Sequence, residues 1–353
     1  DIKNNSWGYA NSYAGLADVG PLHQGAMKAT ALNGRAGRGG ISVWAAGNGR
    51  EAYFQGNKNG LANDMHGIAV GAVTNQGRLS PYSETGNHLA VVAPSNGGTQ
   101  GIVTTDLTGT DGYNPDPKIP DLEDDHFSYT QTFGGTSSAA PVVSGVIALM
   151  LEANPALSWR DVKEIFLRSS RQINPKSSSW VKRTTRDRPD LPPIKHSPLY
   201  GGGLIQAGAA VEMARTWTPL GPQIFAEKIL RPNAGVNFEN NEKKGIDSTA
   251  TFATIIRDPD SGEDNRPKKP RPMRKVFDFT KIQSMSVEHV TLTLNLTHTY
   301  RGDLRINLIS PSGTVSNLAK ASLYDYGASY NDFTFSTLRH WGESPKGKWT
   351  LEI

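Results

Sequence analysis

The sequence predicts an α/β domain, with a parallel sheet covered by helices on both faces, followed by an all-β sandwich. Short apolar strands alternate with helical patterns up to about Trp217. Beyond Trp217 the chain has short β-type runs and no convincing helix. The 353 residues also exceed the usual size of a single hydrophobic core, so two domains are expected.

The elements follow from local patterns. Apolar residues at helical spacing predict a helix over residues 22–32, followed by a turn rich in Gly and Arg at 34–40. Residues 142–151 are apolar on every face, which predicts a buried helix. Ser158 and Asp161 form a capping-box pattern at the start of another helix. Strands are expected at 39–46, 68–73, 89–93, 225–230, 250–256, 290–296 and 304–309.

The composition argues against several classes of protein. The formal net charge is +4 with both signs interspersed, so no nucleic-acid partner is expected. The sequence pattern predicts no apolar run long enough to span a bilayer, so no transmembrane segment is expected. The chain has no cysteine, which excludes a scaffold built on disulfides.

Residues 135–141, Gly-Thr-Ser-Ser-Ala-Ala-Pro, place hydroxyl groups at the start of the apolar helix. Free N–H groups and the positive end of the helix dipole favour an oxyanion there. Pro141 is tolerated because N–H groups in the first turn have no partner within the helix. A hydroxyl that only caps a core helix would give the same pattern, so catalysis and capping both stay open.

The strand at 39–46 ends in Gly47-Asn48-Gly49, and an Asn-Gly pair after a strand most often forms a turn. Taken together, however, this segment and residues 135–141 resemble the subtilisin-like serine proteases. The resemblance implies that Ser137, and not Ser138, is the nucleophile, and that Asn48 is a donor in the oxyanion hole. An amide suits that role because its N–H groups donate without carrying a titrating proton.

Further motifs resemble the kexin/furin (proprotein convertase) branch, in the same order over nearly the whole chain. Those before the β region are residues 1–8, 82–84, 102–107, 151–162 and 196–204. Residues 300–314 and 340–353 resemble the convertase P domain. The resemblance implies that residues 1–218 are the C-terminal part of a subtilisin-like peptidase domain. It also implies that residues 219–353 are a jelly-roll-type P domain, incomplete at its C-terminus.

Two members of the catalytic triad are expected outside this sequence. The convertase Asp and His lie upstream of the Ser-Trp-Gly strand, with which this chain begins. None of the eight histidines stands in the family's His-Gly-Thr context, and His66 is expected in a core or edge-strand role. We therefore expect an internal fragment in which Ser137 has no general base and which is inactive alone.

The resemblance also implies a substrate-binding segment. Ser6, Trp7 and Gly8 are expected to pair with the substrate backbone as an added β-strand. Convertases cut after basic residues because carboxylates line the pocket for the residue before the scissile bond, and Asn11 and Asn59 fall at two of those acidic positions. A buried Lys or Arg needs a paired charge, so weakened dibasic selectivity is expected.

Calcium is expected only as a structural ion, and no cofactor is expected for catalysis. Glu84 retains one of the family's calcium ligands, whereas Phe54 falls at another acidic position. Asp18 and the acidic loop at 111–125 are alternative sources of negative charge. That loop is either a solvated insertion or a rim that attracts basic substrates or holds Ca²⁺.

Three functions stay open. A serine endopeptidase acting on protein or peptide substrates is favoured, because the Gly-Thr-Ser motif and Asn48 are both intact. The alternatives are a catalytically inactive paralogue that acts as a binding or inhibitory module, and a β-sandwich for adhesion or sugar binding. The family resemblance and the absence of cysteine predict a bacterial protein that is secreted or held in the cell envelope. The sequence gives no prediction of oligomeric state.

Overall fold

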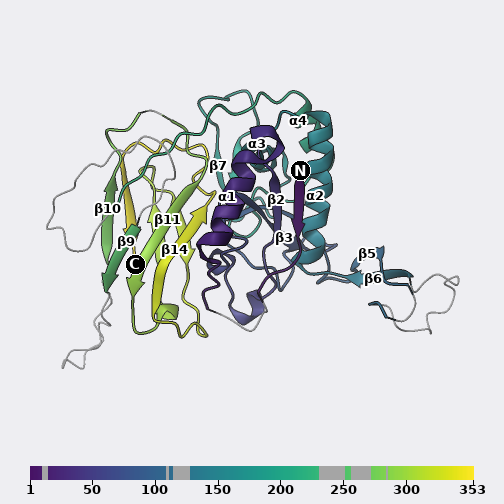
Figure 1. Cartoon of the computed structure of the whole chain (residues 1–353), viewed down its shortest axis with the longest axis horizontal. Coiled ribbons are helices and arrows are strands. Elements are labelled where there is room, and N and C mark those ends of the chain that lie inside the picture. Colours follow the sequence, from purple (N-terminus) through teal and green to yellow (C-terminus); the bar gives the residue numbers. More distant parts are fainter. Residues whose placement is uncertain (10–14, 109–110, 114–127, 230–250, 256–271, 284) are drawn as a thin grey trace.

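The computed structural model describes residues 1–9, 15–108, 111–113, 128–229, 251–255, 272–283 and 285–353. Figure 1 shows two parts side by side along the long axis. We call the elements from β1 to α4 the α/β part and those from β9 to β15 the β part. A parallel sheet with helices in the first and largely antiparallel sheets in the second confirm the predicted fold class.

The α/β part is built on a four-stranded parallel sheet in the order β1-β2-β3-β4. Every residue of β3 is buried, as expected for a parallel strand covered on both faces. The bounds of the strands are β1 Ile2–Asn5, β2 Ile41–Ala45, β3 Gly67–Val73 and β4 Leu89–Pro94.

Helices cover the two faces of this sheet, and Figure 1 shows α1 and α2 on either side of its strands. Val43 of β2 packs in one core cluster with Val143 of α2, whereas the neighbouring Trp44 packs in another with Met27 of α1. This alternation follows from the two-residue period of a strand. The helices are α1 Gly20–Gly37, α2 Thr136–Ala153, α3 Trp159–Ser169 and α4 Ala207–Arg215.

The sequence signals for the ends of two helices are confirmed. The turn expected at 34–40 appears as a break in α1, where Gly34, Arg35 and Ala36 have non-helical dihedral angles. At the start of α3 the hydroxyl of Ser158 accepts from the Asp161 N–H, and the Asp161 carboxylate accepts from the Ser158 N–H. The capping box therefore forms as predicted.

One helix within the described ranges, α2, is long and apolar enough by length and composition to cross a membrane, whereas no such segment was expected from the sequence. Val143, Ile147 and Met150 of α2 are buried in the same core cluster as the sheet residues. Because core helices of this kind meet the same criterion, the finding is weak evidence for a membrane span.

The β part contains a sheet in the order β10-β15-β12-β13 and a second in the order β14-β11-β9. Leu292 and Phe335 from one sheet share a core with Leu308 and Trp349 from the other, which makes this part a sandwich. The strand expected at 225–230 is wrong for residues 225–229, where no strand forms. The strands are β9 Thr251–Ile255, β10 Arg274–Asp278, β11 Val290–Thr297, β12 Ile306–Ile309, β13 Val315–Ala319, β14 Ser329–Thr337 and β15 Lys348–Glu352.

Two small sheets and three short 3₁₀ helices complete the described elements. The β5–β6 hairpin projects from the body of the molecule in Figure 1. The bounds are β5 Ile102–Thr105, β6 Tyr129–Phe133, β7 Val181–Arg183, β8 Ile194–His196, η1 Arg50–Ala52, η2 Gly56–Lys58 and η4 Arg301–Asp303.

The two parts share a core. Leu338 and Trp341, which follow β14, are 1% exposed and belong to the cluster that α2 and α3 form with the parallel sheet. The indole N–H of Trp341 donates to the carboxylate of Glu164 at 3.2 Å, and the N–H of Leu338 donates to the carbonyl of Asn87 at 2.8 Å. The boundary at 218/219 stays a prediction.

Candidate active site

Three loops at the carboxyl edge of the parallel sheet meet the N-terminus of α2. Ser6 follows β1, Asn48 follows β2 and Ser95 follows β4. In open parallel sheets, ligands bind outside the carboxyl ends of the strands. The N-terminus of a helix adds free N–H groups and a positive dipole end. This edge is therefore suited to bind a developing negative charge.

Ser137 lies in the first turn of α2 and is partly exposed. Its hydroxyl donates to the carbonyl of Ser6 at 3.3 Å, and the Ser6 hydroxyl donates to the carbonyl of Ser137 at 2.8 Å. Ser138 is buried, and its hydroxyl lies 2.7 Å from that of Ser95. Of the two serines, Ser137 is the one that is partly exposed, which supports its assignment as the nucleophile.

The side chain of Asn48 is held in one orientation by Thr136. Its Oδ1 accepts from the backbone N–H of Thr136 at 2.8 Å and from the Thr136 hydroxyl at 2.9 Å. That hydroxyl in turn accepts from the N–H of Gly47 at 3.1 Å. Within the described part of the chain no acceptor is recorded for Nδ2 of Asn48. The amide nitrogen is therefore available to donate to a ligand.

Gly135 allows Asn48 to come this close to the start of the helix. Its φ is +75°, a region that favours glycine. A Cβ placed on Gly135 would lie 3.0 Å from Nδ2 of Asn48. Any side chain here would strain the backbone and crowd the amide.

Four supporting residues were not predicted as part of the site. Thr136 fixes Asn48, and Ser95 bonds both the Gly135 carbonyl and the Ser138 hydroxyl at 2.7 Å. The remaining two, Asn96 and Tyr82, bond each other, and Asn96 accepts from the Gly135 N–H at 3.0 Å. Thr136 and Tyr82 stand in motifs that carry the family resemblance. The position of Ser95 and Asn96 directly after a buried strand is the signal that could have identified the other two.

The predicted substrate-binding residues are only partly brought together. Ser6 contacts Ser137, and Trp7 is 61% exposed while its ring packs against Trp44 with 5.1 Å between centroids. A Cβ on Gly8 would lie 4.0 Å from Leu61, whose N–H donates to the side chain of Asn59 at 3.1 Å. The segment after β1 thus lies beside the turn that carries Asn59. The other predicted position, Asn11, lies outside the described residues.

None of the seven described histidines bonds with Ser137. His23 packs against Trp44, and His66 pairs with Asp64 at 2.9 Å in a largely buried position. His88 and His196 are buried, and His289, His298 and His340 belong to the β part. The eighth histidine, His126, lies outside the described residues.

Two family profiles match the chain. Residues 1–194, more than half of its length, match the Subtilase family. The chain belongs to the subtilase family. Residues 287–353 match the Proprotein convertase P-domain, which confirms the resemblance predicted from the motifs.

Several convertases are similar to this subtilase over the whole chain. Proprotein convertase subtilisin/kexin type 4 of Mus musculus is 32% identical over 100% of this chain and 47% of its own length. Furin of Homo sapiens is 30% identical over 100% of this chain and 38% of its own length. The chain therefore spans about half, or less, of these relatives.

A solved structure, the serine protease of Aeromonas sobria, is similar with a TM-score of 0.75 and 23% identity. That match covers 99% of this subtilase chain and 64% of the other chain. At this level of identity the likeness shows the fold alone.

The described residues do not make a calcium site around Glu84. This carboxylate is buried, accepts from the Gly49 N–H at 3.1 Å, and lies against Gly47, where a Cβ would be 2.3 Å from its Oε1. No group of three or more His, Asp or Glu side chains that could hold a metal occurs in the described ranges. Ca²⁺ takes six to eight oxygen ligands, so one carboxylate is a poor fit.

The other proposed sources of negative charge give no support for a calcium ion or an acidic pocket. The resemblance implied that position 54 is acidic in the family. In this chain it is Phe54, whose ring packs against Gly49. Asp18 is exposed, and its carboxylate accepts from the N–H of Gly20. Most of the acidic loop, residues 114–125, lies outside the described residues. Calcium stays a prediction and enters no step of the mechanism.

Burial raises the pKa of Glu84 from 4.5 to about 7, and the hydrogen bond from Gly49 opposes only part of that shift. Between these two pH values the folded protein holds a proton that the unfolded chain has released. Relative to a Glu84→Gln variant, the free energy of unfolding of the wild type should therefore fall as the pH rises from 4.5 through 7. The expected fall is up to about 3 kcal/mol.

Urea unfolding of both proteins in EDTA at pH 4.5 and at about pH 8 measures this difference. Glu51→Gln, which alters an exposed glutamate nearby, is the matched control and should show no such trend. A wild-type-minus-variant difference that stays constant with pH would contradict the buried, protonated carboxyl.

Proposed function

We propose that this subtilase is a serine endopeptidase that hydrolyses peptide bonds through an acyl-enzyme on Ser137. One observation carries the proposal. The partly exposed Ser137 and the available amide nitrogen of Asn48 both lie at the N-terminus of α2, where Thr136 binds the oxygen of the Asn48 amide. A helix-capping serine needs no such donor beside it.

The proposed mechanism begins with attack of the Ser137 oxygen on the scissile carbonyl carbon. We propose that this chain is part of a longer polypeptide, in which a histidine upstream of Asp1 takes the hydroxyl proton and an aspartate orients that histidine. The N–H of Ser137 and the amide of Asn48 bind the oxyanion. When the C–N bond breaks, the histidine returns the proton to the leaving amine. Water then hydrolyses the ester by the same steps and restores the Ser137 hydroxyl.

Substrate would bind along the segment that leaves β1. Ser6 and Ser137 are joined by two hydrogen bonds, so a peptide paired with residues 6–8 would have its scissile bond beside the nucleophile. Pairing with backbone groups supplies affinity that does not depend on sequence. The substrates proposed are therefore extended segments of proteins or peptides.

The proposal is tested with the longer polypeptide and with the 353-residue chain alone. A fluorophosphonate probe, which esterifies activated serine hydroxyls, should label Ser137 in the longer polypeptide, and a quenched peptide should be cleaved. The 353-residue chain should do neither, because the proposed base is absent from it. If the longer polypeptide is neither labelled nor active, the inactive paralogue is the better description.

Weakened dibasic selectivity is a further part of the proposed function. Asn59 offers a dipole rather than a charge to the residue before the scissile bond, and its Oδ1 already accepts from Leu61. A buried Lys or Arg of the substrate would therefore lack a full counter-charge at this position. We expect a peptide library to show cleavage beyond paired basic sites. Cleavage confined to paired basic sites would overturn this point.

We also propose that the protein is bacterial and exported, to the medium or the cell envelope. A chain without cysteine does not depend on oxidative folding, and its two largest hydrophobic clusters are large enough to need no cross-links. Fractionation of the source cells, followed by detection of the protein with an antibody, tests the location. Recovery from the cytosol alone would contradict it.

A further inference from the structure

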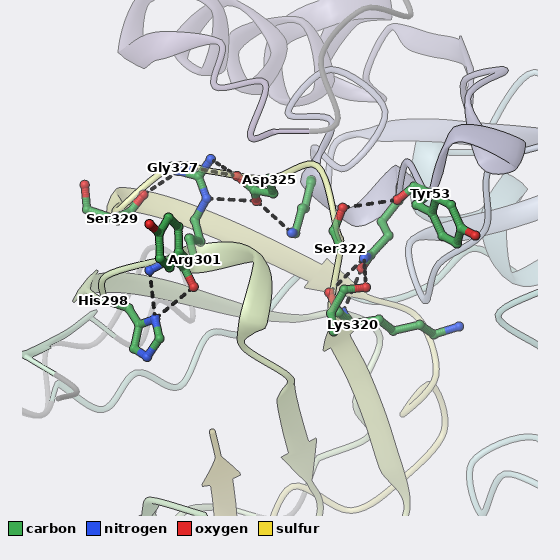
Figure 2. A network of polar contacts seen from close by, with 12 residues as sticks. Tyr53, His298, Arg301, Lys320, Ser322, Asp325, Gly327 and Ser329 are labelled. Atoms are coloured by element: carbon green, nitrogen blue, oxygen red, sulfur yellow. Dashed lines mark hydrogen bonds and ion pairs between the residues drawn. The ribbon is translucent and has the colours of Figure 1, made fainter. Parts of the chain in front are cut away.

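The β part forms hydrogen bonds with a loop of the α/β part that has almost no regular secondary structure. This loop, residues 53–63, contains the short helix η2 and carries Asn59. Figure 2 shows Lys320 and Ser322 of the β part reaching Tyr53 and its neighbours. The side-chain amide of Gln55 donates to the carbonyl of Lys320 at 2.8 Å and accepts from the N–H of Lys320 at 2.7 Å. The hydroxyl of Ser322 lies 3.5 Å from the Tyr53 carbonyl.

The far end of the 53–63 loop is fixed to strand β14. Asn63 donates to the carbonyl of Thr334 at 2.6 Å, and its own side-chain oxygen accepts from the N–H of Ser336 at 3.0 Å. Asn57 donates to the carbonyl of Ser336 at 2.9 Å. The β part therefore fixes both ends of the loop, in addition to the hydrogen bonds that the loop makes within its own backbone.

Between these two anchors lies a buried ion pair. The ammonium of Lys58 is 2.8 Å from the carboxylate of Asp325, and their side chains are 2% and 0% exposed. Arg301 holds the same carboxylate with two hydrogen bonds, at 3.0 and 2.6 Å, as Figure 2 shows. Asp325 is the one acidic partner recorded for Lys58 in the described residues.

Asp325 thus has two cationic partners and Lys58 has one acidic partner in the described part of the chain, and the pKa shifts of both side chains agree with this difference. Burial alone would raise the pKa of Asp325, but the hydrogen bonds and charges of Arg301 and Lys58 lower it below its usual value. Burial lowers the pKa of Lys58, and Asp325 opposes that shift. Asp325 would keep a cation if Lys58 were lost, whereas Lys58 would have no counter-charge if Asp325 were lost. An unpaired buried charge is strongly unfavourable, so the side chain of Lys58 would have to move.

A movement of Lys58 would displace the neighbouring backbone, which leads to the proposed substrate cleft. The carbonyl of Lys58 accepts from the N–H of Ala17 at 2.9 Å, and the N–H of Gly60 donates to the carbonyl of Ala17 at 2.8 Å. Asn59 stands between these two bonds and is tied to Leu61, which lies beside Gly8. The ion pair and the substrate segment are thus joined by one short stretch of chain.

We propose that Asp325 is a positioning residue for substrate recognition, which acts through Lys58 to hold Asn59 at the substrate cleft. The inference rests on the proposed function and goes beyond it, because it places a determinant of substrate binding in the β part. Asp325 itself touches no substrate. Its effect is on the ground-state fit of the substrate and not on the groups that stabilise the oxyanion.

The test uses the longer polypeptide, with Asp325→Asn and Lys58→Met as the variants and Lys58→Arg as the conservative rescue. We expect Asp325→Asn to raise KM for peptides by about 10-fold, since a displaced Asn59 would lose contacts made equally in the ground state and the transition state. Lys58→Met should also raise KM, and kcat should change little in both variants. Lys58→Arg should restore KM. Active-site titration with the fluorophosphonate probe corrects each kcat for the folded fraction.

Glu288→Gln is the matched control, because Glu288 also forms an ion pair between the two parts, with Arg160, away from the 53–63 loop. It should leave KM unchanged. An equal rise of KM in this control would mean that the β part acts only as a general support, and the inference would fail. An unchanged KM in Asp325→Asn would overturn it as well, with the proposed function intact.

Hydrogen exchange supplies a readout that does not need activity. Amides of the 53–63 loop should exchange faster in folded Asp325→Asn than in the wild type, with strands β2 and β3 unchanged. Uniform faster exchange would show a loss of stability throughout and would overturn a local role. A wild-type protein that hydrolyses nothing overturns the proposed function, and with it the role in substrate binding, whatever exchange shows.

Discussion

Replacing Ser137 with alanine in the longer polypeptide is expected to lower kcat by about 10⁶-fold, the loss known for the nucleophile of subtilisin. The reason is that the substitution removes the only atom proposed to bond the substrate carbonyl carbon. The neighbouring groups stay in place, because the Ser137 side chain makes a single recorded hydrogen bond, to Ser6. Peptide hydrolysis, followed by initial rates over several substrate concentrations, measures the change.

Ser138→Ala is the matched control for this prediction. Ser138 is 1% exposed and its hydroxyl bonds Ser95 and Gly135, so its loss should cost stability and leave most of the activity. Loss of a buried hydrogen bond is worth about 1 kcal/mol, which thermal unfolding can detect. If Ser138 were indispensable and Ser137 dispensable, the assignment of the nucleophile would be wrong by one residue.

The second large effect is expected at Asn48. Asn48→Ala should lower kcat by about 10²–10³-fold with little change in KM, because the contact with the oxyanion forms in the transition state. The magnitude is again that of subtilisin. A rise in KM with kcat intact would instead indicate a role in the turn or in binding the substrate ground state.

The structure offers a sharper variant of the same test. Asn48→Asp keeps an acceptor for the N–H and hydroxyl of Thr136, at 2.8 and 2.9 Å in the wild type, and removes the N–H donor. If Asn48 acts as a donor, Asn48→Asp should lose at least as much kcat as Asn48→Ala while its melting temperature stays closer to that of the wild type. Near-normal activity in Asn48→Asp would contradict the donor role.

Local signals in the sequence predicted much of the α/β part. The run at 68–73 is buried along its whole length in β3, and the capping box of Ser158 and Asp161 forms as expected. Patterns of this kind work because their cause lies within a few residues. The choice of Ser137 came from the resemblance, since two adjacent serines differ in burial only once the helix is packed.

Contacts between distant residues could not be predicted in the same way. Lys58 and Asp325 are far apart in sequence, and nothing near either one identifies the other as its partner. A lysine in a polar loop looks solvated until the β part covers it. The strand expected at 225–229 was wrong for a related reason, because an apolar β-type run forms a strand only where a neighbouring strand can pair with it.

Trp341 has a consequence for the order of events during synthesis. It is part of the core beneath α3, although it lies near the end of the chain and is made long after that helix. At about 5–20 residues per second, the ribosome takes on the order of ten seconds between completing the α/β part and adding this tryptophan. During that interval the nascent α/β part has an unfilled apolar core. We expect the α/β part to complete its packing only after the β part has been made, so that folding of the first part depends on translation of the second.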